Sequence, residues 1–241
     1  MNLACDSCPV RDSAACSVLT PEQRDALAAA GRTRVLERGE MLFAAGDTDA
    51  ACATLVSGAL KVSAVDRDGN EQILSLVHPS GFIGELFTPF ANHDVVALTK
   101  SRLCTFARVD LARAIETYPA LAQTLLRRSQ EDLLATRSLL ELTAHASAET
   151  RLAALLHDFA AAASASSCHV ASEFDLPLTR GEIANMLGLT IETVSRKFKE
   201  LEASGAILRK GKRGIELVDP ALLHSLSGRE EALRSPLSLD P

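Results

Sequence analysis

The chain has 241 residues, 47% of them hydrophobic and 4% aromatic, with a formal net charge of −6 at pH 7. This length suits one large or two small domains, and the apolar fraction is ordinary for a soluble globular protein. No apolar run is long enough to span a bilayer, and the N-terminus lacks the apolar core of a signal peptide. We therefore expect a cytoplasmic protein without a membrane partner.

The first part of the chain holds a group of cysteines, Cys5, Cys8 and Cys16, in the spacing C-x2-C-x7-C. Thiols of cytoplasmic proteins tend to stay reduced, so close cysteines more often bind metals or act in redox chemistry than form structural disulfides. Thiolates select zinc, copper(I) or iron–sulfur clusters, and a zinc site or a [4Fe–4S] cluster needs four ligands. The spacing favours a metal or a cluster, and the alternatives are a thiol redox switch and unliganded thiols.

Residues 19–110 carry the pattern of a short helix followed by a β-domain. The helix is expected from Leu19 to Gly31, with Thr20 as its N-cap and Pro21 at its first position. Short apolar or alternating runs follow, separated by glycines, and Asp66–Glu71 (DRDGNE) is typical of a hairpin turn. Many short strands with close turns predict a β-barrel or a sandwich.

Residues 111–145 predict two helices. Asp110 is expected to cap the first helix, and Pro119 to begin a longer one. Leucines fall near one stripe of the longer helix, with polar residues between them. The helix either packs on its own β-domain or forms a two-stranded coiled coil in a homodimer. In the second case the polar residues would weaken the seam, as a regulated dimer requires. The predicted dimer seam consists of Leu121, Leu125, Ser129, Leu133, Thr136 and Leu140.

A helix expected from Ala148 to Ala163 precedes the stretch Leu178–Gly205, which predicts two helices joined by a sharp turn. Thr179 can cap the first of these helices, Gly188 can end it in the left-handed conformation, and Thr190 can cap the second. The buried stripe of the second helix is expected to be Val194, Phe198 and Leu201. This is the helix-turn-helix pattern, in which the N-terminal end of the second helix enters the major groove of DNA.

The polar face of the second helix suits base recognition. Glu192, Ser195 and Arg196 share one helical face, at i, i+3 and i+4. A glutamate can accept from cytosine, an arginine can bind guanine through two bonds, and a serine can contact several base edges. The alternative is an ordinary helical hairpin with a solvated charged face. The residues predicted to contact DNA are Thr179, Arg180, Thr190, Glu192, Thr193, Ser195, Arg196, Lys199, Arg209, Lys210 and Lys212.

The stretch Ala206–Asp219 (AILRKGKRGIELVD) predicts the β-hairpin wing of a winged helix, with basic residues at its turn for DNA phosphates. From Thr179 to Arg213 there are eight basic residues and four acidic ones, in a chain that is acidic overall. A basic patch on one module of an acidic chain is the electrostatic footprint expected of a DNA-binding domain.

This order of segments resembles the CRP/FNR superfamily of transcription regulators, and most of all its oxygen-sensing FNR branch. The motifs that carry the resemblance are ETVSR at Glu192–Arg196, GFIGEL at Gly81–Leu86, the N-terminal cysteines, and Cys104 in SRLCTF. The resemblance implies an α+β fold with a cyclic-nucleotide-binding-like β-barrel (jelly roll), a long dimerisation helix and a winged helix-turn-helix. The expected segments are a cysteine-rich leader (1–18), the β-barrel (19–110), the helices (111–145), the DNA-binding domain (146–219) and a tail (220–241).

The resemblance also implies the site residues and partners. It makes Cys5, Cys8, Cys16 and Cys104 the four ligands of an oxygen-labile [4Fe–4S] cluster. Cys52, in an apolar run, and Cys168, in a loop, are then ordinary cysteines. TTGAT-type half-sites would be read by Glu192, Ser195 and Arg196. The implied partners are double-stranded DNA, a second copy of the chain and RNA polymerase. A regulator of the same fold that senses nitric oxide or redox state through haem or thiols is the alternative.

Two further classes of function are not expected. The cyclic-nucleotide branch of the family holds the phosphate with an Arg-Ser pair, whereas the corresponding stretch here is ANHDVVALT, in which Asp94 would repel a phosphate. We therefore expect no cyclic nucleotide, and we expect Glu85 to be a structural remnant. No Ser/His/Asp set, phosphate loop or pair of carboxylates stands in a recognisable setting, so we do not expect an enzyme.

Overall fold

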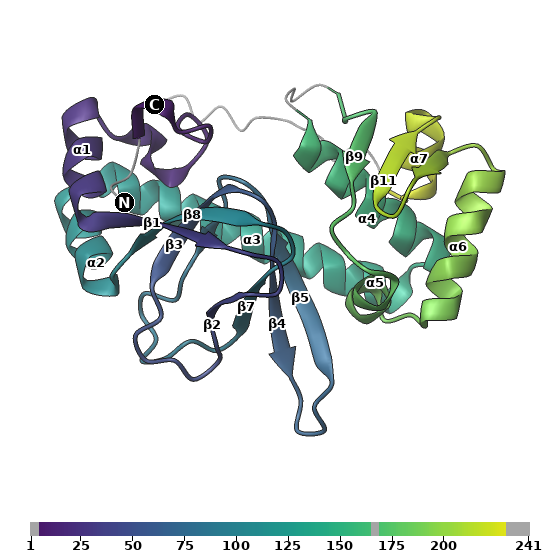
Figure 1. The fold of residues 1–241 in the computed structure, drawn as a ribbon, viewed down its shortest axis with the longest axis horizontal. Coiled ribbons are helices and arrows are strands. Elements are labelled where there is room, and N and C mark those ends of the chain that lie inside the picture. The colour runs from purple at the N-terminus through teal and green to yellow at the C-terminus, as the bar shows by residue number, and fades with distance from the viewer. Residues whose placement is uncertain (1–4, 165–168, 230–241) are drawn as a thin grey trace. The chain divides into compact units, whose positions relative to one another are not determined.

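The computed structural model of the protein describes residues 5–164 and 169–229. Cys168 lies outside the described residues. The chain divides into two compact units, Met1–Leu140 and Glu141–Pro241, so the division falls inside the long helix α3 (Pro119–His145; Figure 1) and not at its end. None of the described helices is long and apolar enough to cross a membrane.

The first unit contains the predicted β-barrel (jelly roll), and this prediction is confirmed. Within the described residues its strands form two four-stranded antiparallel sheets, in the orders β1-β8-β3-β6 and β2-β7-β4-β5. The strands are β1 Gly31–Leu36, β2 Met41–Phe43, β3 Cys52–Ser57, β4 Leu60–Val65, β5 Glu71–Val77, β6 Phe82–Ile83, β7 Asp94–Ala97 and β8 Ser101–Phe106.

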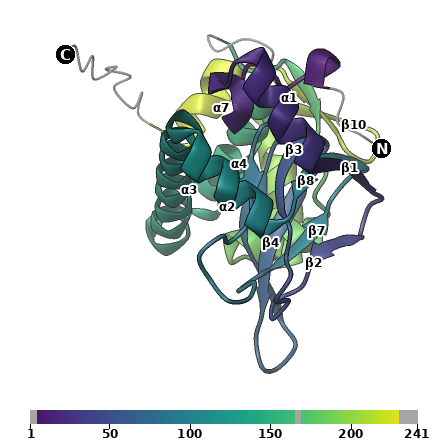
Figure 2. The same cartoon turned by 90° about the vertical axis from the view of Figure 1, so that its left-hand side faces the viewer.

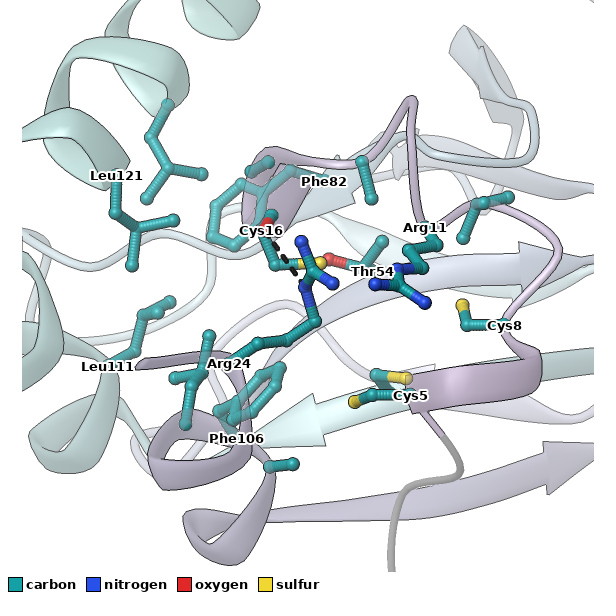
Figure 3. Close-up of a pocket in the computed structure, with 17 residues that line it drawn as sticks. Cys5, Cys8, Arg11, Cys16, Arg24, Thr54, Phe82, Phe106, Leu111 and Leu121 are labelled. Atoms are coloured by element: carbon teal, nitrogen blue, oxygen red, sulfur yellow. Dashed lines mark hydrogen bonds between the residues drawn. The ribbon is translucent and has the colours of Figure 1, made fainter. Parts of the chain in front are cut away.

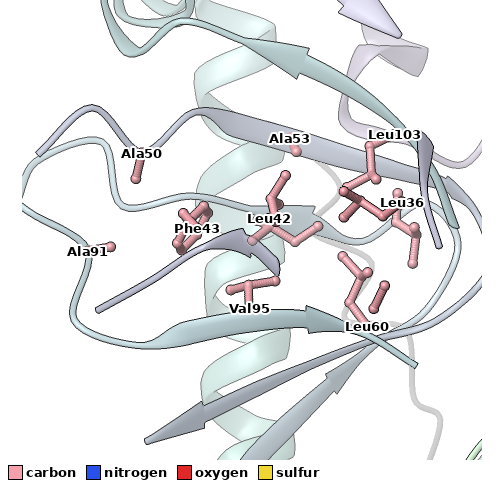
Figure 4. Close-up of a cluster of buried hydrophobic side chains, with 12 residues drawn as sticks. Leu36, Leu42, Phe43, Ala50, Ala53, Leu60, Ala91, Val95 and Leu103 are labelled. Carbon is pink, nitrogen blue, oxygen red and sulfur yellow. The ribbon is translucent and has the colours of Figure 1, made fainter. Parts of the chain in front are cut away.

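Apolar side chains from both sheets fill the space between them (Figure 4). Leu36 of β1 and Leu103 of β8 meet Leu60 of β4 and Val95 of β7 there, and all four are buried. The alternation of side chains along each strand therefore gives the barrel one dry inner face and leaves the opposite face of each sheet for other contacts.

The β4–β5 hairpin extends beyond the rest of its sheet (Figure 1, Figure 2). Its turn is the predicted one. The Asp66 carboxylate accepts from the backbone N–H groups of Asp68 at 2.8 Å and Asn70 at 2.9 Å, and Gly69 has a φ of +84°. A glycine adopts this left-handed conformation without steric cost, which explains why the DRDGNE pattern predicted the turn.

Helices cover the outer face of the sheet that contains β8. They are the short 3₁₀ turns η1 Cys5–Ser7 and η2 Ala15–Val18, and the helices α1 Pro21–Ala30, α2 Arg108–Thr117 and α3 Pro119–His145. Thr20 caps α1 as predicted. The predicted cap at Asp110 is wrong: α2 begins at Arg108, and Asp110 lies in its first turn, 3.3 Å from Arg113. The backbone N–H of Asp110 already donates to the Ala107 carbonyl, so the helix starts before this residue.

The second unit contains the winged helix-turn-helix. Its elements are α4 Ala148–Ala163, β9 Glu173–Asp175, α5 Arg180–Leu187, α6 Ile191–Ala203, β10 Ile207–Lys210, β11 Gly214–Leu217 and α7 Pro220–Leu226. The wing strands β10 and β11 pair as predicted, and β9 adds a third strand that the sequence pattern did not indicate. Helix α7 occupies the start of the segment that we treated as a tail. The Asp219 side chain caps it and Pro220 is its first residue, a local signal that could have revealed it.

Candidate functional site

The cysteine-rich leader is packed against the first unit. Val10 and Ala14 are buried against Val56 of β3, and Cys8 and Cys16 lie beside them. The apolar residues between the cysteines thus attach the leader to the sheet. Arg128 of α3 also donates a hydrogen bond to the Ser13 carbonyl, so the leader is attached to the long helix as well as to the sheet.

Cys104 approaches the leader from the sheet. It lies in β8 between β1 and β3, where it stands opposite Thr33 and Thr54. Its neighbour Leu103 is fully buried inside the barrel. Successive side chains of a strand point to opposite faces, so Cys104 projects from the outer face, where Cys8 and Cys16 pack against the same apolar cluster.

Cys5, Cys8, Cys16 and Cys104 line one cavity of about 50 Å³ (Figure 3), which we call the four-cysteine cavity. A single water molecule needs only about 10–15 Å³ of such space. The wall is otherwise mostly apolar and includes Phe106 of β8, Leu111 of α2 and Leu121 and Leu125 of α3. The structure therefore brings together the four cysteines that the family resemblance selected.

Burial is the main influence on the acidity of three of these thiols. Burial, and then proximity to Cys8, Cys5 and Cys16, raises the pKa of Cys104 to about 12. Burial also raises the pKa of Cys5 and of Cys16. Thiolate is the form that binds metals, and a metal ion removes the proton outright. In the absence of a metal, the raised pKa of Cys5, Cys16 and Cys104 favours their neutral thiol form.

Four cysteines are a donor set that an iron–sulfur cluster can use. Among the residues that the structure describes, no three His, Cys, Asp or Glu side chains are arranged to hold one metal ion. In a [4Fe–4S] cluster each cysteine binds a different iron, so its four sulfur ligands stand further apart than those of a single ion. The four thiols that line this apolar cavity are chemically compatible with such a cluster.

Cys52 has a different environment. It is fully buried in β3, does not line the four-cysteine cavity, and burial raises its pKa to about 11. Gly84, with a φ of +146°, lies against it: a Cβ at Gly84 would stand 2.7 Å from the Cys52 sulfur. The packing of Cys52 is that of an ordinary core residue.

In the second unit, the local signals of the helix-turn-helix are confirmed. The Thr179 hydroxyl accepts from the Glu182 N–H at 3.1 Å, and the Glu182 carboxylate accepts in return from the Thr179 N–H at 2.8 Å. Gly188 takes the left-handed conformation with a φ of +62°, and the Thr190 hydroxyl caps α6. The predicted stripe of α6 is fully buried, and consists of Val194, Phe198 and Leu201.

The opposite face of α6 remains accessible. Glu192 and Arg196 are exposed, and Ser195 between them is partly exposed. The pKa of Glu192 is lowered, chiefly by its own backbone N–H and then by the Thr190 side chain at the start of the helix. Ile191, at the first position of α6 beside Glu192, is also 52% exposed.

The basic residues of the wing fall into two groups. Arg209 is paired with Glu202 at 2.5 Å, and Lys210 with Glu173 at 3.2 Å and Glu216 at 3.0 Å. In the described part of the chain, Lys212 and Arg213 at the tip of the wing form no ion pair.

Arg180 has a third kind of environment. Burial, and then repulsion from Arg209, lowers its pKa to about 10, and its guanidinium lies over the Phe198 ring. This contact gives Arg180 a role within the domain that the sequence pattern did not indicate. Its predicted contact with DNA stays a prediction.

The dimer seam requires a correction. Leu121 and Leu125 are 2% and 8% exposed and line the four-cysteine cavity, so these two residues pack on their own unit. Leu133 and Leu140 are 49% and 69% exposed, and Ser129 and Thr136 are exposed with them. Leu126, which the predicted seam did not include, is 63% exposed and lies seven residues before Leu133. The exposed leucines that recur every seven residues are Leu126, Leu133 and Leu140.

Glu85, the acidic residue of the GFIGEL run, is engaged by its own loop. Its carboxylate accepts from the Thr88 hydroxyl at 3.1 Å and the Asn92 N–H at 3.2 Å, and faces His93 at 3.5 Å. Glu85 therefore holds its own loop together.

The chain is similar to known proteins in both sequence and fold. Profiles of the Crp-like helix-turn-helix domain and of the cyclic nucleotide-binding domain match residues 150–226 and 33–118. The chain is 32% identical to the transcriptional activator protein FnrL of Cereibacter sphaeroides, over 93% of this chain and 92% of FnrL. It is 31% identical to the nitrogen fixation regulation protein FixK of Bradyrhizobium diazoefficiens, over 92% and 93% of the two chains. The structure of FixK2 from Bradyrhizobium japonicum shares the fold, with a TM-score of 0.75 at 23% identity over 83% of this chain and 98% of FixK2.

Proposed function

Because the chain belongs to the CRP/FNR superfamily and is a DNA-binding transcription regulator, we propose that oxygen controls its DNA affinity through a [4Fe–4S] cluster in the four-cysteine cavity. The observation that supports this proposal is the convergence of three leader cysteines and Cys104 on one apolar cavity. Bound there, the cluster would supply oxygen-labile iron–thiolate bonds that join the leader to β8.

The chain itself provides a route from the cavity to a dimer interface. Leu121 and Leu125 of α3 line the cavity, and Arg128 of the same helix holds the leader at Ser13. On another face of the same helix, Leu126, Leu133 and Leu140 present an exposed apolar stripe. A change in how the leader is held therefore acts on the helix that carries this stripe.

We propose that this stripe forms the seam of a homodimer. Apolar residues that recur every seven positions on a long helix are typical of a two-stranded coiled coil. Two helix-turn-helix modules in such a dimer contact half-sites about 34 Å apart, one turn of DNA. A monomer contacts one half-site only, so the loss of the dimer lowers affinity without any change in α6.

The proposed target is a TTGAT-type near-palindrome read by the exposed face of α6. In this assignment Glu192, Ser195 and Arg196 contact base edges, and Lys212 and Arg213 of the wing contact phosphates. RNA polymerase is the proposed further partner at promoters.

Two alternative sensors find less support in the cavity. Reactive cysteines have a lowered pKa, whereas burial raises the pKa of Cys5, Cys16 and Cys104. This environment disfavours a thiol redox switch. A haem is often held by a histidine, and no histidine lines the cavity among the described residues.

The test is to measure dimerisation and operator binding of anaerobically purified protein before and after exposure to air. We expect sedimentation to show conversion from dimer to monomer, and the operator Kd to rise. A chain with Cys104→Ala should behave before exposure as the wild type does after it. Dimerisation and operator binding that air leaves unchanged would overturn the proposal.

A further inference from the structure

The four-cysteine cavity has two cations among its lining residues, Arg11 and Arg24. The fold buries Arg24, which is 9% exposed, whereas Arg11 is only half-buried. Burial removes the water that stabilises a charge, so buried arginines are normally paired with an anion. The groups that surround Arg24 therefore determine which anion can balance its charge.

Arg24 reaches from α1 to the leader. Its Nε donates to the Cys16 carbonyl at 3.4 Å (Figure 3), and its Nη2 donates to the Leu19 carbonyl at 3.0 Å. These neutral acceptors orient the guanidinium but do not balance its charge. Within residues 5–164 and 169–229, no aspartate or glutamate forms an ion pair with it.

The groups of this cavity that can become anionic are its four thiols, Cys5, Cys8, Cys16 and Cys104. Among the described residues, no carboxylate lines the cavity. Arg24 thus lies in the wall of a cavity in which the anions would be thiolates.

We propose that Arg24 is an electrostatic positioning residue for the cluster, and that its fixed charge offsets the negative charge of four thiolates in an apolar cavity. This inference rests on the proposed function. A cluster with four thiolate ligands is anionic overall, so a nearby cation favours the addition of an electron and opposes the removal of one. A guanidinium suits this role because it keeps its charge even when buried.

A purely structural role for Arg24 makes a different prediction. In that case its two carbonyl bonds hold η2 in place, and any residue without the guanidinium geometry disturbs the site. Arg24→Lys separates the two roles, because it keeps the charge and loses the forked hydrogen bonds. Arg34 provides a matched control: it donates to the Leu42 and Met41 carbonyls at 3.0 and 3.1 Å, away from the cavity.

The experiment uses the full chain purified without oxygen, as wild type and as Arg24→Lys, Arg24→Gln, Arg24→Met and Arg34→Gln. Iron and sulfide per chain, and thermal unfolding of the metal-free chain, are measured first. The midpoint potential is then measured by titration with dithionite and mediators, in which one electron enters the cluster and no bond breaks. The rate at which the cluster absorbance is lost in air is the second readout.

We expect Arg24→Gln and Arg24→Met to shift the midpoint potential to more negative values and to speed cluster loss roughly three- to tenfold, with Arg24→Lys and Arg34→Gln close to wild type. If Arg24→Gln and Arg24→Met hold no iron while Arg24→Lys does, the charge is required for assembly, which also supports the proposal. Unchanged potentials in the uncharged variants would overturn it, as would Arg24→Lys behaving like Arg24→Gln. A wild type without iron would overturn the proposed function together with this inference.

Discussion

The guanidinium carbon of Arg180 lies 3.2 Å from the centroid of the Phe198 ring. Arg180 is the first residue of α5 and Phe198 is fully buried in α6, so the contact joins the two helices of the helix-turn-helix. A cation over an aromatic face contributes about 0.5–1 kcal/mol when exposed and about 2 kcal/mol when desolvated. A charged side chain thus stabilises the domain core next to its recognition face.

Replacing Arg180 with alanine should lower the free energy of unfolding of the second unit by about 1–2 kcal/mol, because Phe198 loses its cover. Urea titration followed by circular dichroism measures this loss. Arg196→Ala is the control, since it removes an arginine whose side chain is 68% exposed and should change stability by less than about 0.5 kcal/mol. Equal losses in the two variants would contradict the structural role of Arg180.

Arg196 and Lys212 should differ in what they contribute to DNA binding. Arg196→Ala should cost roughly 1–3 kcal/mol per half-site and relax the preference for guanine. Lys212→Ala should weaken binding to all sequences alike and reduce the slope of affinity against salt by about one. Site selection combined with a salt titration separates these effects. If both variants changed specificity in the same way, the placement of α6 in the groove would be wrong.

Substitutions of two leucines of α3 should affect different properties, dimerisation for Leu133 and stability for Leu121. Leu133→Glu should raise the dimer dissociation constant at least about tenfold, because the seam would bury an unpaired charge, and should leave the first unit folded. Leu121→Ala should instead destabilise the first unit by about 2–5 kcal/mol through a cavity in its core. Analytical ultracentrifugation and thermal unfolding of both variants test this contrast. A Leu133→Glu chain that still sediments as a dimer would place the interface elsewhere.

Gly84→Ala should destabilise the first unit by about 2–4 kcal/mol. The backbone there has a φ of +146°, and the new Cβ would stand 2.7 Å from the Cys52 sulfur and 2.9 Å from its Cα. Gly46→Ala is the matched control, because Gly46 also has a positive φ, of +93°, but open space around it. Its loss should be about 1 kcal/mol. Similar melting temperatures for the two variants would show that Cys52 yields to the added methyl group.

Local signals in the sequence predicted the caps and turns of this fold. The capping box at Thr179 and the left-handed Gly188 each depend on a few neighbouring residues, so the sequence pattern contains the cause of the structure. The same holds for the Asp66 turn. Asp219 and Pro220 carried an equally local helix signal that went unused.

Such local patterns could not predict packing between residues that are far apart in the sequence. We predicted one stripe for Leu121 and Leu133, but they are twelve residues apart and lie about 120° apart around the helix. Leu121 packs in the apolar cluster under the helices, whereas Leu133 is exposed. The choice of Cys104 came from the family resemblance. Successive side chains of β8 point to opposite faces, and Leu103 fills the barrel interior. Cys104 therefore points outwards, where the leader lies. The burial of Arg24 could not be predicted, since an arginine in an amphipathic helix is usually exposed.

The most direct measurement is the iron and sulfide content of chains purified without oxygen, comparing the wild type, Cys104→Ala and Cys52→Ala. Both substitutions remove a partly or fully buried cysteine of one sheet, and of these two only Cys104 lines the four-cysteine cavity. The account predicts about four irons and four sulfides per chain in the wild type and in Cys52→Ala, and their loss in Cys104→Ala. A wild type without iron, or a Cys104→Ala chain that keeps its full content, would contradict it.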